Sequence, residues 1–208
     1  MIKIKNFLEK NNIEFYEDFY IGKVSSIKLG DKAKIVIYPH TVIQLKRLLK
    51  FFYVSKIYYR VFGNLSNVLI IEKIDYPIII TNKMKTEIER EGNIVTVSAG
   101  TLISKLFEYM KKNELSGIEA ISGIPATIGG ALYCNAGAFG SSISDNLVSV
   151  EVFCEGKCLI LRKNEIKFGY HFSSLSGFVV LSATFLFENK KEYEIIKLFN
   201  EFTFRRNN

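Results

Sequence analysis

The chain has 208 residues, of which 48% are hydrophobic and 24% are charged, and this composition is typical of a globular protein with a sizeable core. No uninterrupted apolar run approaches the length that spans a membrane, and the first six residues contain no apolar signal core. The three cysteines, an odd number, fit a reducing compartment. We therefore expect a cytoplasmic protein of one or two compact units, without a membrane partner.

The formal net charge of +7 falls entirely within the first 60 residues, which contain twelve Lys and Arg against five Asp and Glu. The remaining residues contain sixteen of each kind. A basic segment attracts anions by long-range steering, and nucleic acid is one such partner. However, the lysines are scattered along the segment, and the sequence contains no named nucleic-acid motif. We therefore do not expect a nucleic-acid partner.

The first part of the chain is expected to mix helices with short strands. An amphipathic first helix places Ile4, Phe7 and Leu8 on one side. Thr41 is a suitable N-cap for a second helix. The predicted elements are helices at 2–11 and 42–52 and strands at 33–38, 56–62, 68–71 and 78–80.

The second part continues this mixture. Its predicted elements are a strand at 94–98, a helix that follows a cap at 99–101 and runs to about 113, a hairpin of 148–154 and 158–161, a strand at 178–187 and a helix at 190–206. The last helix has one expected packed face, formed by Tyr193, Ile196, Leu198 and Phe199. Short strands interspersed with helices indicate the α+β class.

Cys154 and Cys158 flank the predicted hairpin turn, and we expect that they could face each other across the two strands. The only histidines, His40 and His171, are distant in sequence. We therefore expect no metal site and no redox role for the cysteine pair.

Residues 117–145 contain six of the fourteen glycines, with small residues between them. A backbone with so little side-chain bulk can lie directly against another group, and glycine allows successive N–H groups to converge on an anion. Pro125 favours a shaped turn that leads into a helix start, where free N–H donors suit phosphate. A flexible linker would be polar, whereas this stretch alternates with isoleucines and is expected to be buried. Close packing of small residues on a sheet is the alternative interpretation.

This stretch resembles the signature of the UDP-N-acetylenolpyruvoylglucosamine reductases (UDP-N-acetylmuramate dehydrogenases), the MurB family of flavoproteins. The family pattern Gly-Ile-Pro-Gly-x-x-Gly-Gly-Ala, then Asn-Ala-Gly-Ala-aromatic-Gly, then Ile-x-Asp corresponds to 123–131, 135–140 and 143–145. The family's phosphate loop, Gly-x-Gly-Ser-Asn after a strand, corresponds to 63–67. Leu65 and Ala126 stand where the family has glycine, and 25–30 is similar to a further family motif, Thr-Thr-Phe-x-Ile-Gly.

The resemblance implies an α+β, two-lobed FAD-binding fold of the PCMH/vanillyl-alcohol-oxidase type. The first FAD-binding lobe is expected at 1–83 and the second at 84–188. Residues 189–208 then form a C-terminal helix, a stub of the family's substrate domain, which this chain is expected to lack. In the family, NADPH reduces the FAD, and the flavin passes hydride to the enolpyruvyl group of a UDP-sugar in peptidoglycan synthesis.

The resemblance also names site residues. Those expected to bind FAD come from both motifs and from one glycine before the predicted 102–113 helix: Gly63, Asn64, Leu65, Ser66, Asn67, Gly100, Gly123, Ile124, Pro125, Ala126, Thr127, Gly129, Gly130, Asn135, Ala136, Gly137, Ala138 and Gly140. The family's Tyr-Arg-x-Ser motif aligns with Tyr170 to Ser173, which makes His171 the catalytic candidate in place of Arg. Tyr170 and Ser173 are substrate-binding candidates. The family's catalytic Ser and Glu have no candidate here.

Three functions stay open at this point. The first is a MurB-like oxidoreductase, truncated or completed by a second chain. The second is a catalytically inactive flavin-binding module for electron transfer, regulation or assembly. The third is a basic binding protein whose pocket Leu65 and Ala126 have closed, although Ser66, Asn67 and Gly129 are retained.

Overall fold

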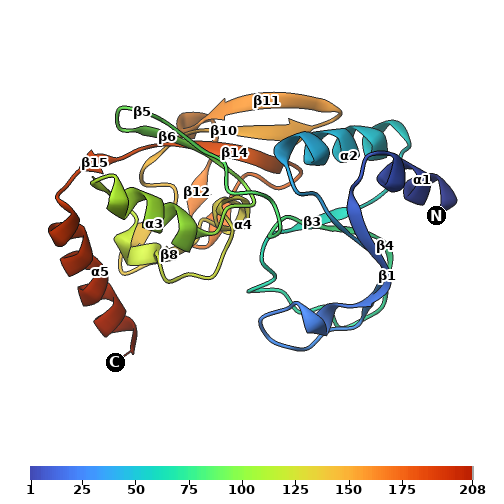
Figure 1. The fold of residues 1–208 in the computed structure, drawn as a ribbon, viewed down its shortest axis with the longest axis horizontal. Coiled ribbons are helices and arrows are strands. Elements are labelled where there is room, and N and C mark those ends of the chain that lie inside the picture. Colours follow the sequence, from blue (N-terminus) through green and yellow to red (C-terminus); the bar gives the residue numbers. More distant parts are fainter. Residues whose placement is uncertain (208) are drawn as a thin grey trace.

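The computed structural model describes residues 1–207 and has α+β architecture, as predicted (Figure 1). Two sheets form two lobes, in agreement with the expected two-lobed fold. The helices are α1 (Ile2–Lys10), α2 (Val42–Val54), α3 (Ile103–Lys112), α4 (Ile128–Cys134) and α5 (Glu192–Asn207). Within residues 1–207, none of these helices is both long and apolar enough to cross a bilayer.

The first sheet has the strand order β1-β2-β4-β3. Its strands are β1 (Glu14–Tyr20), β2 (Lys32–Tyr38), β3 (Arg60–Phe62) and β4 (Ile74–Ile80). β2, β4 and β3 run parallel, and β1 is antiparallel to β2. Helices α1 and α2 pack against one face of this sheet through Leu8, Leu45 and Phe52. Because β3 and β4 are parallel neighbours, the loops that follow them lie at the same sheet edge.

The second sheet is antiparallel, with the order β11-β10-β14-β6-β5. Its strands are β5 (Ile88–Glu91), β6 (Ile94–Ser98), β10 (Leu147–Cys154), β11 (Lys157–Arg162) and β14 (Val179–Leu186). Helices α3 and α4 share its apolar core, which includes Leu106, Ile128 and Phe185. Three short pairs complete the lobe, formed by β7 (Leu115–Ser116) with β15 (Glu188–Asn189), β8 (Gly137–Ala138) with β9 (Ser141–Ser142), and β12 (Phe168–Gly169) with β13 (Phe172–Ser173).

Helix α2 joins the two lobes. The apolar cluster that contains its buried side chains also contains Phe153 of β10 and Leu181 of β14. Single 3₁₀ turns lie at η1 (Ile21–Lys23), η2 (Glu119–Ile121) and η3 (Lys163–Glu165). The two sheets lie on either side of the proposed boundary at residues 83 and 84, and the boundary itself stays a prediction.

Two strand predictions need correction in the first lobe. The strand expected at 56–62 begins only at Arg60, and the buried strand expected at 68–71 is absent from the described structure. Leu69 and Ile71 are 52% and 76% exposed, so this apolar run lies at the surface outside any strand, and Ile70 is its one buried residue. β1 was not predicted, because its residues alternate poorly and it is a partly exposed edge strand.

The predicted packed face of the last helix is also wrong in detail. Ile195 is the one fully buried side chain that α5 contributes, whereas Tyr193 is 71% exposed. Phe199 does pack, with its ring centroid 5.0 Å from that of Phe107 on α3. The helix therefore touches the lobe along a narrow stripe.

The cysteine hairpin forms, but its register excludes the expected pairing. Cys154 lies opposite Lys157, and Phe153 lies opposite Cys158. Because successive strand residues point to opposite faces, the two cysteines project from opposite sides of the hairpin. All three cysteines are free, and no group of metal-ligating side chains occurs within residues 1–207.

Candidate functional site

The loop of residues 63–67 follows β3 at the carboxyl edge of the first sheet. Within residues 1–207, none of its five backbone amides donates a hydrogen bond to another protein group. Unpaired N–H groups in a row are the donors that an anion requires. This loop is therefore the strongest candidate for binding phosphate.

Leu65, which stands where the family motif has glycine, adopts a backbone conformation that glycine favours. Its φ of +52° lies in the left-handed region that glycine favours. Its side chain is 2% exposed and packs in an apolar cluster with Ile21 and Ile70 of the first lobe. The side chain therefore packs into the lobe, and the substitution does not require a different loop backbone.

The second glycine loop, residues 123–130, leads into α4 as predicted, with Thr127 as the N-cap. The expectation of free donors at this helix start is wrong. Ile128 N donates to Thr101 O and Gly129 N to Ala99 O, both at 2.8 Å, and Gly130 N donates to Thr127 Oγ1 at 3.2 Å. Carbonyl oxygens of the turn before α3 thus accept the hydrogen bonds from Ile128 and Gly129 that an anion would otherwise accept.

The two loops meet where the lobes meet. A Cβ on Gly63 would lie less than 3.0 Å from Thr127 Oγ1 and 3.6 Å from the Cα of Gly130. Asn64 Nδ2 donates to Pro125 O at 3.0 Å. Backbone from both lobes is therefore in direct contact, and the absence of a side chain at Gly63 makes this possible.

Asn82 belongs to this junction, although sequence reasoning missed it. It follows β4, and its Nδ2 donates to Asn64 Oδ1 at 3.2 Å. Its Oδ1 is buried without a partner among the described residues. The available signal was its place directly after a buried strand parallel to β3, because such positions share one sheet edge.

Three other glycines that were expected to bind FAD lie against other segments of the protein and do not face an open space for the cofactor. A Cβ on Gly100 would lie less than 3.0 Å from Thr81 O, and one on Gly129 would lie 3.0 Å from the Cβ of Ala99. A Cβ on Gly137 would lie 2.8 Å from Ser141 O across the β8–β9 hairpin. These three glycines allow close packing between segments of the protein.

The remaining motif residues lie at the other end of α4. Asn135 ends this helix with φ +46°, and its Nδ2 donates to Gly169 O at 2.9 Å. Ser173 Oγ donates to Tyr133 O at 2.7 Å, so its hydroxyl already has a structural partner. The neighbouring candidates Ala136, Ala138 and Gly140 lie in the turn after α4 and in the β8–β9 hairpin.

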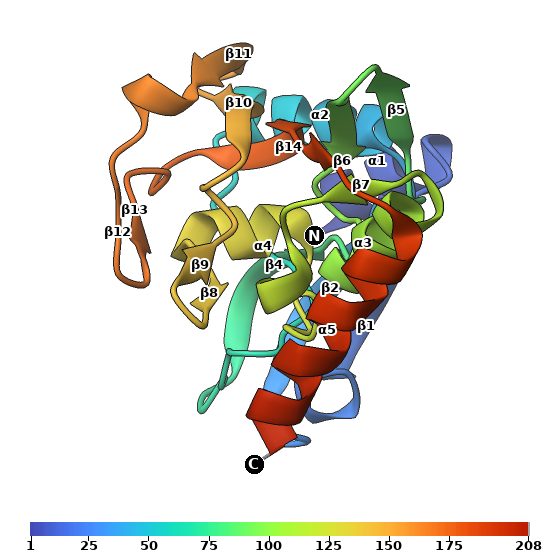
Figure 2. The ribbon, with the colours of Figure 1, turned by 90° about the vertical axis from the view of Figure 1, so that its left-hand side faces the viewer.

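Tyr170 and His171 form the tip of the β12–β13 hairpin, which Figure 2 shows projecting beside α4 and β9. Tyr170 is 94% exposed, and its ring centroid lies 4.3 Å from that of His171. Within residues 1–207, no hydrogen bond or ion pair links His171 to either glycine loop. The structure thus presents His171 at the surface.

Lys83, which follows Asn82, is neutralised by its own neighbours. Its Nζ pairs with Glu14 and lies 4.3 Å from the centroid of Tyr38. Burial raises the pKa of Glu14, but hydrogen bonds from Lys83, Tyr16 and His40 outweigh it and hold that pKa below its ordinary value. Backbone amides, rather than this cation, are therefore the donors at the sheet edge.

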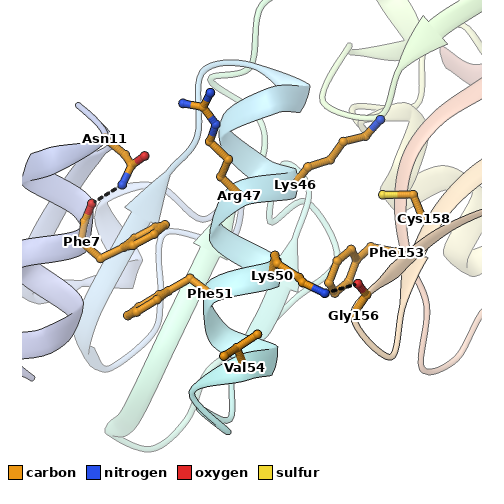
Figure 3. A pocket seen from close by; sticks show the side chains of 10 residues that line it. All are labelled: Phe7, Asn11, Lys46, Arg47, Lys50, Phe51, Val54, Phe153, Gly156 and Cys158. Atoms are coloured by element: carbon orange, nitrogen blue, oxygen red, sulfur yellow. Dashed lines mark hydrogen bonds between the residues drawn. The ribbon is translucent and has the colours of Figure 1, made fainter.

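A separate hollow of about 570 Å³ lies on the outer side of α2 (Figure 3). Phe7 and Phe51 stack at one side of it, and Lys46, Arg47 and Lys50 project from α2. Lys46 pairs with Glu151, and Lys50 donates to Gly156 O. No residue expected to bind FAD lines this hollow, so the loop junction is the candidate site.

The model of the FAD binding domain family matches residues 33–162. The UDP-N-acetylenolpyruvoylglucosamine reductase of Caldicellulosiruptor saccharolyticus is 36% identical over 211 residues, which cover 99% of this chain and 68% of the relative. That of Clostridioides difficile is 35% identical over 209 residues, with the same shares covered. The chain belongs to the MurB family. It is an FAD-binding, MurB-like oxidoreductase, as the two motifs predicted.

Solved structures agree with this family. The crystal structure of MurB from Thermus caldophilus superposes with a TM-score of 0.78 at 28% identity, covering 94% of this chain and 69% of that one. An alkyldihydroxyacetonephosphate synthase has a TM-score of 0.69 at 14% identity, over 91% of this chain and 40% of that one. At such low identity the second likeness shows the fold alone, and it confirms the PCMH/vanillyl-alcohol-oxidase type.

Proposed function

We propose that the chain holds the pyrophosphate of FAD on the backbone amides of residues 63–67. The observation that carries this proposal is the row of five unpaired N–H groups at the contact between the lobes. A dianion placed there would accept hydrogen bonds that the protein leaves unmade, and charge-assisted bonds of this kind are strong. The residues present therefore fit the cofactor that the family requires.

Neighbouring side chains complete the proposed binding site. Ser66 and Asn67 add hydroxyl and amide donors next to the loop. The buried and unpartnered Oδ1 of Asn82 is an acceptor for a hydroxyl of the cofactor. From the second loop, Gly123 and Thr127 have backbone amides without a protein acceptor in the described part of the chain. We assign these residues to the dinucleotide portion of FAD.

FAD supplies the hydride chemistry, and the protein binds and orients it. We propose NADPH as the electron donor and the enolpyruvyl UDP-sugar of peptidoglycan synthesis as the acceptor, in a cytoplasmic reaction. His171 and Tyr170, exposed at the hairpin tip, are positioned to meet a substrate that arrives from outside this lobe. Histidine has fewer donors than arginine, so it would clamp an anion less firmly.

The chain spans about two thirds of its relatives, 68% of the reductase from Caldicellulosiruptor saccharolyticus. We propose that turnover of the UDP-sugar needs residues beyond these 208. A flavin-binding module without turnover is the second candidate, because His171 stands at the position of the family's arginine. Loss of the cofactor is disfavoured by the left-handed φ of Leu65, because the backbone there keeps a conformation that glycine would also adopt.

An anaerobic visible spectrum of the FAD-loaded protein tests these candidates. Bleaching by NADPH, followed by recovery on addition of the UDP-sugar, supports the complete reaction. Bleaching without recovery supports the need for residues beyond these 208. A flavin spectrum that NADPH leaves unchanged supports the inactive module and contradicts the proposed oxidoreductase function.

A further inference from the structure

Arg206 connects the C-terminal helix to the second glycine loop. Its Nη2 donates to Ala120 O at 2.9 Å, and its guanidinium carbon lies 5.5 Å from the centroid of the Phe139 ring. Figure 2 shows α5 running from the side of β7 and α3 toward its end at the bottom of the view. The helix end therefore reaches the segment that leads into α4.

Gly123 leaves the space that this guanidinium occupies. A Cβ on Gly123 would lie less than 3.0 Å from both Nη1 and Cζ of Arg206. The φ of Gly123 lies outside the left-handed region, so other residues could adopt its backbone conformation. Glycine is therefore needed at position 123 because a side chain there would collide with the guanidinium of Arg206.

Aromatic contacts fix the helix end against the same region. The ring of Phe202 stacks on that of Phe139, with centroids 5.5 Å apart and planes 27° apart. Phe139 lies in the turn of the β8–β9 hairpin, next to Gly140. The arginine is thus held between an aromatic ring and the backbone at Gly123, in a geometry that suits a planar guanidinium.

We infer that Arg206 is a positioning residue for FAD, an inference that rests on the proposed function. Its bond to Ala120 O and its packing on Gly123 hold the backbone that continues to Pro125. Pro125 O is the acceptor for Asn64, and Asn64 belongs to the loop whose amides meet the pyrophosphate. Arg206 therefore acts on the cofactor through Asn64.

The test measures the Kd of FAD by quenching of flavin fluorescence, together with the melting temperature of the FAD-free protein. Arg206→Ala is expected to weaken FAD binding about ten-fold, as expected for loss of a charged hydrogen bond. Arg206→Lys should recover part of this loss, because lysine keeps the charge but not the planar donor. Arg205→Ala is the control, since Arg205 lies on the same helix and, among the described residues, pairs with Glu201 and the Phe202 ring.

Two double variants separate positioning from general stability. In an Asn64→Ala background, Arg206→Ala should change the FAD Kd less than about two-fold, because the link to the phosphate loop is already absent. Gly123→Ala displaces the guanidinium, so it should weaken binding in the wild type and add nothing to Arg206→Ala. If Arg206→Ala fails to fold, the FAD Kd of Gly123→Ala still tests the inference.

The outcomes are distinct. An unchanged FAD Kd in both Arg206→Ala and Gly123→Ala overturns the inference alone, as does a loss of full size in the Asn64→Ala background. A lower melting temperature with unchanged affinity overturns it as well, since Arg206 would then be purely structural. Absence of FAD binding by the wild type overturns the proposed function and the inference together.

Discussion

Asn64 bridges the two lobes with one side chain, because its Nδ2 donates to Pro125 O at 3.0 Å. The same amide group accepts a hydrogen bond from Asn82 at 3.2 Å. The phosphate loop is therefore fixed from both sides, by the second glycine loop and by the end of β4. Asn64 therefore helps to hold the unpaired amides of this loop in place, together with the buried side chain of Leu65.

Replacing Asn64 with alanine removes both of these hydrogen bonds. We expect FAD affinity to fall about ten-fold, which corresponds to about 1.4 kcal/mol, together with a decrease in melting temperature, because the side chain is half-buried and both of its hydrogen bonds are lost. Asn164→Ala, an exposed asparagine in η3, is the control. Equal FAD affinity in the Asn64 variant and the control would show that the bridge does not shape the site.

Gly63 has no room for a side chain. Gly63→Ala places a methyl group against Thr127 Oγ1, so the lobes must separate or the N-cap must move. We expect both FAD affinity and melting temperature to decrease. Thr127→Ala removes the obstructing oxygen at a cost of about 1 kcal/mol for the lost cap. The double variant should be more stable than the sum of the two single effects predicts, and strict additivity would contradict the clash.

Leu65 combines buried packing with a left-handed backbone. Leu65→Ala should lower the free energy of unfolding by about 2–4 kcal/mol, because it empties a buried site. Leu65→Gly removes one more carbon but relieves about 1 kcal/mol of left-handed strain. Urea unfolding should therefore find the glycine variant no less stable than the alanine variant. A glycine variant less stable by about 1 kcal/mol, as in ordinary backbone, would contradict this account.

Tyr38 is buried, and its hydroxyl has no hydrogen-bond partner among residues 1–207. Burial, with a further contribution from Glu14, raises its pKa to about 12. The unfolded chain loses this proton near pH 10, whereas the folded chain keeps it until about pH 12. Folding stability should therefore decrease as the pH rises through this window. Tyr38→Phe removes this dependence, and it should raise stability at pH 7 by about 1 kcal/mol. Unfolding curves at pH 7 and pH 11 for both proteins provide the check.

His171 lies at an exposed hairpin tip and makes no hydrogen bond to the glycine loops within residues 1–207. We expect His171→Ala to bind FAD with an affinity within about two-fold of the wild type, since such surface substitutions change free energies by about 0.5 kcal/mol or less. His171→Arg alone should not give the family's turnover of UDP-sugar. Robust turnover by that single variant would show that no residues beyond these 208 are needed.

Sequence reasoning found most of the helices, the second sheet apart from its edge strand β5, and the two loops, because these depend on local periodicity and on turn residues. It could not find Asn82, whose role depends on β3 and β4 being parallel neighbours. It also misjudged the start of α4. The N–H of Gly129 donates to Ala99, and this acceptor is brought there only by tertiary packing.

The glycines illustrate the same limit. Their density correctly predicted close approach of backbone, but the sequence does not say what approaches. Gly129 packs against Ala99, and Gly123 packs against Arg206 from the C-terminal helix. The strand expected at 68–71 failed for a related reason, because apolar residues in a short run need not be buried.

The most direct test of the account is a comparison of FAD with riboflavin, which has the same ring system but no pyrophosphate, in titrations of the wild-type protein. If the amides of residues 63–67 hold the pyrophosphate, FAD should bind at least about 100-fold more tightly, a difference of about 2.7 kcal/mol. Asn64→Ala should reduce that ratio while leaving the affinity for riboflavin unchanged. Equal affinity for the two flavins, or no binding of FAD, would contradict the assignment of this loop.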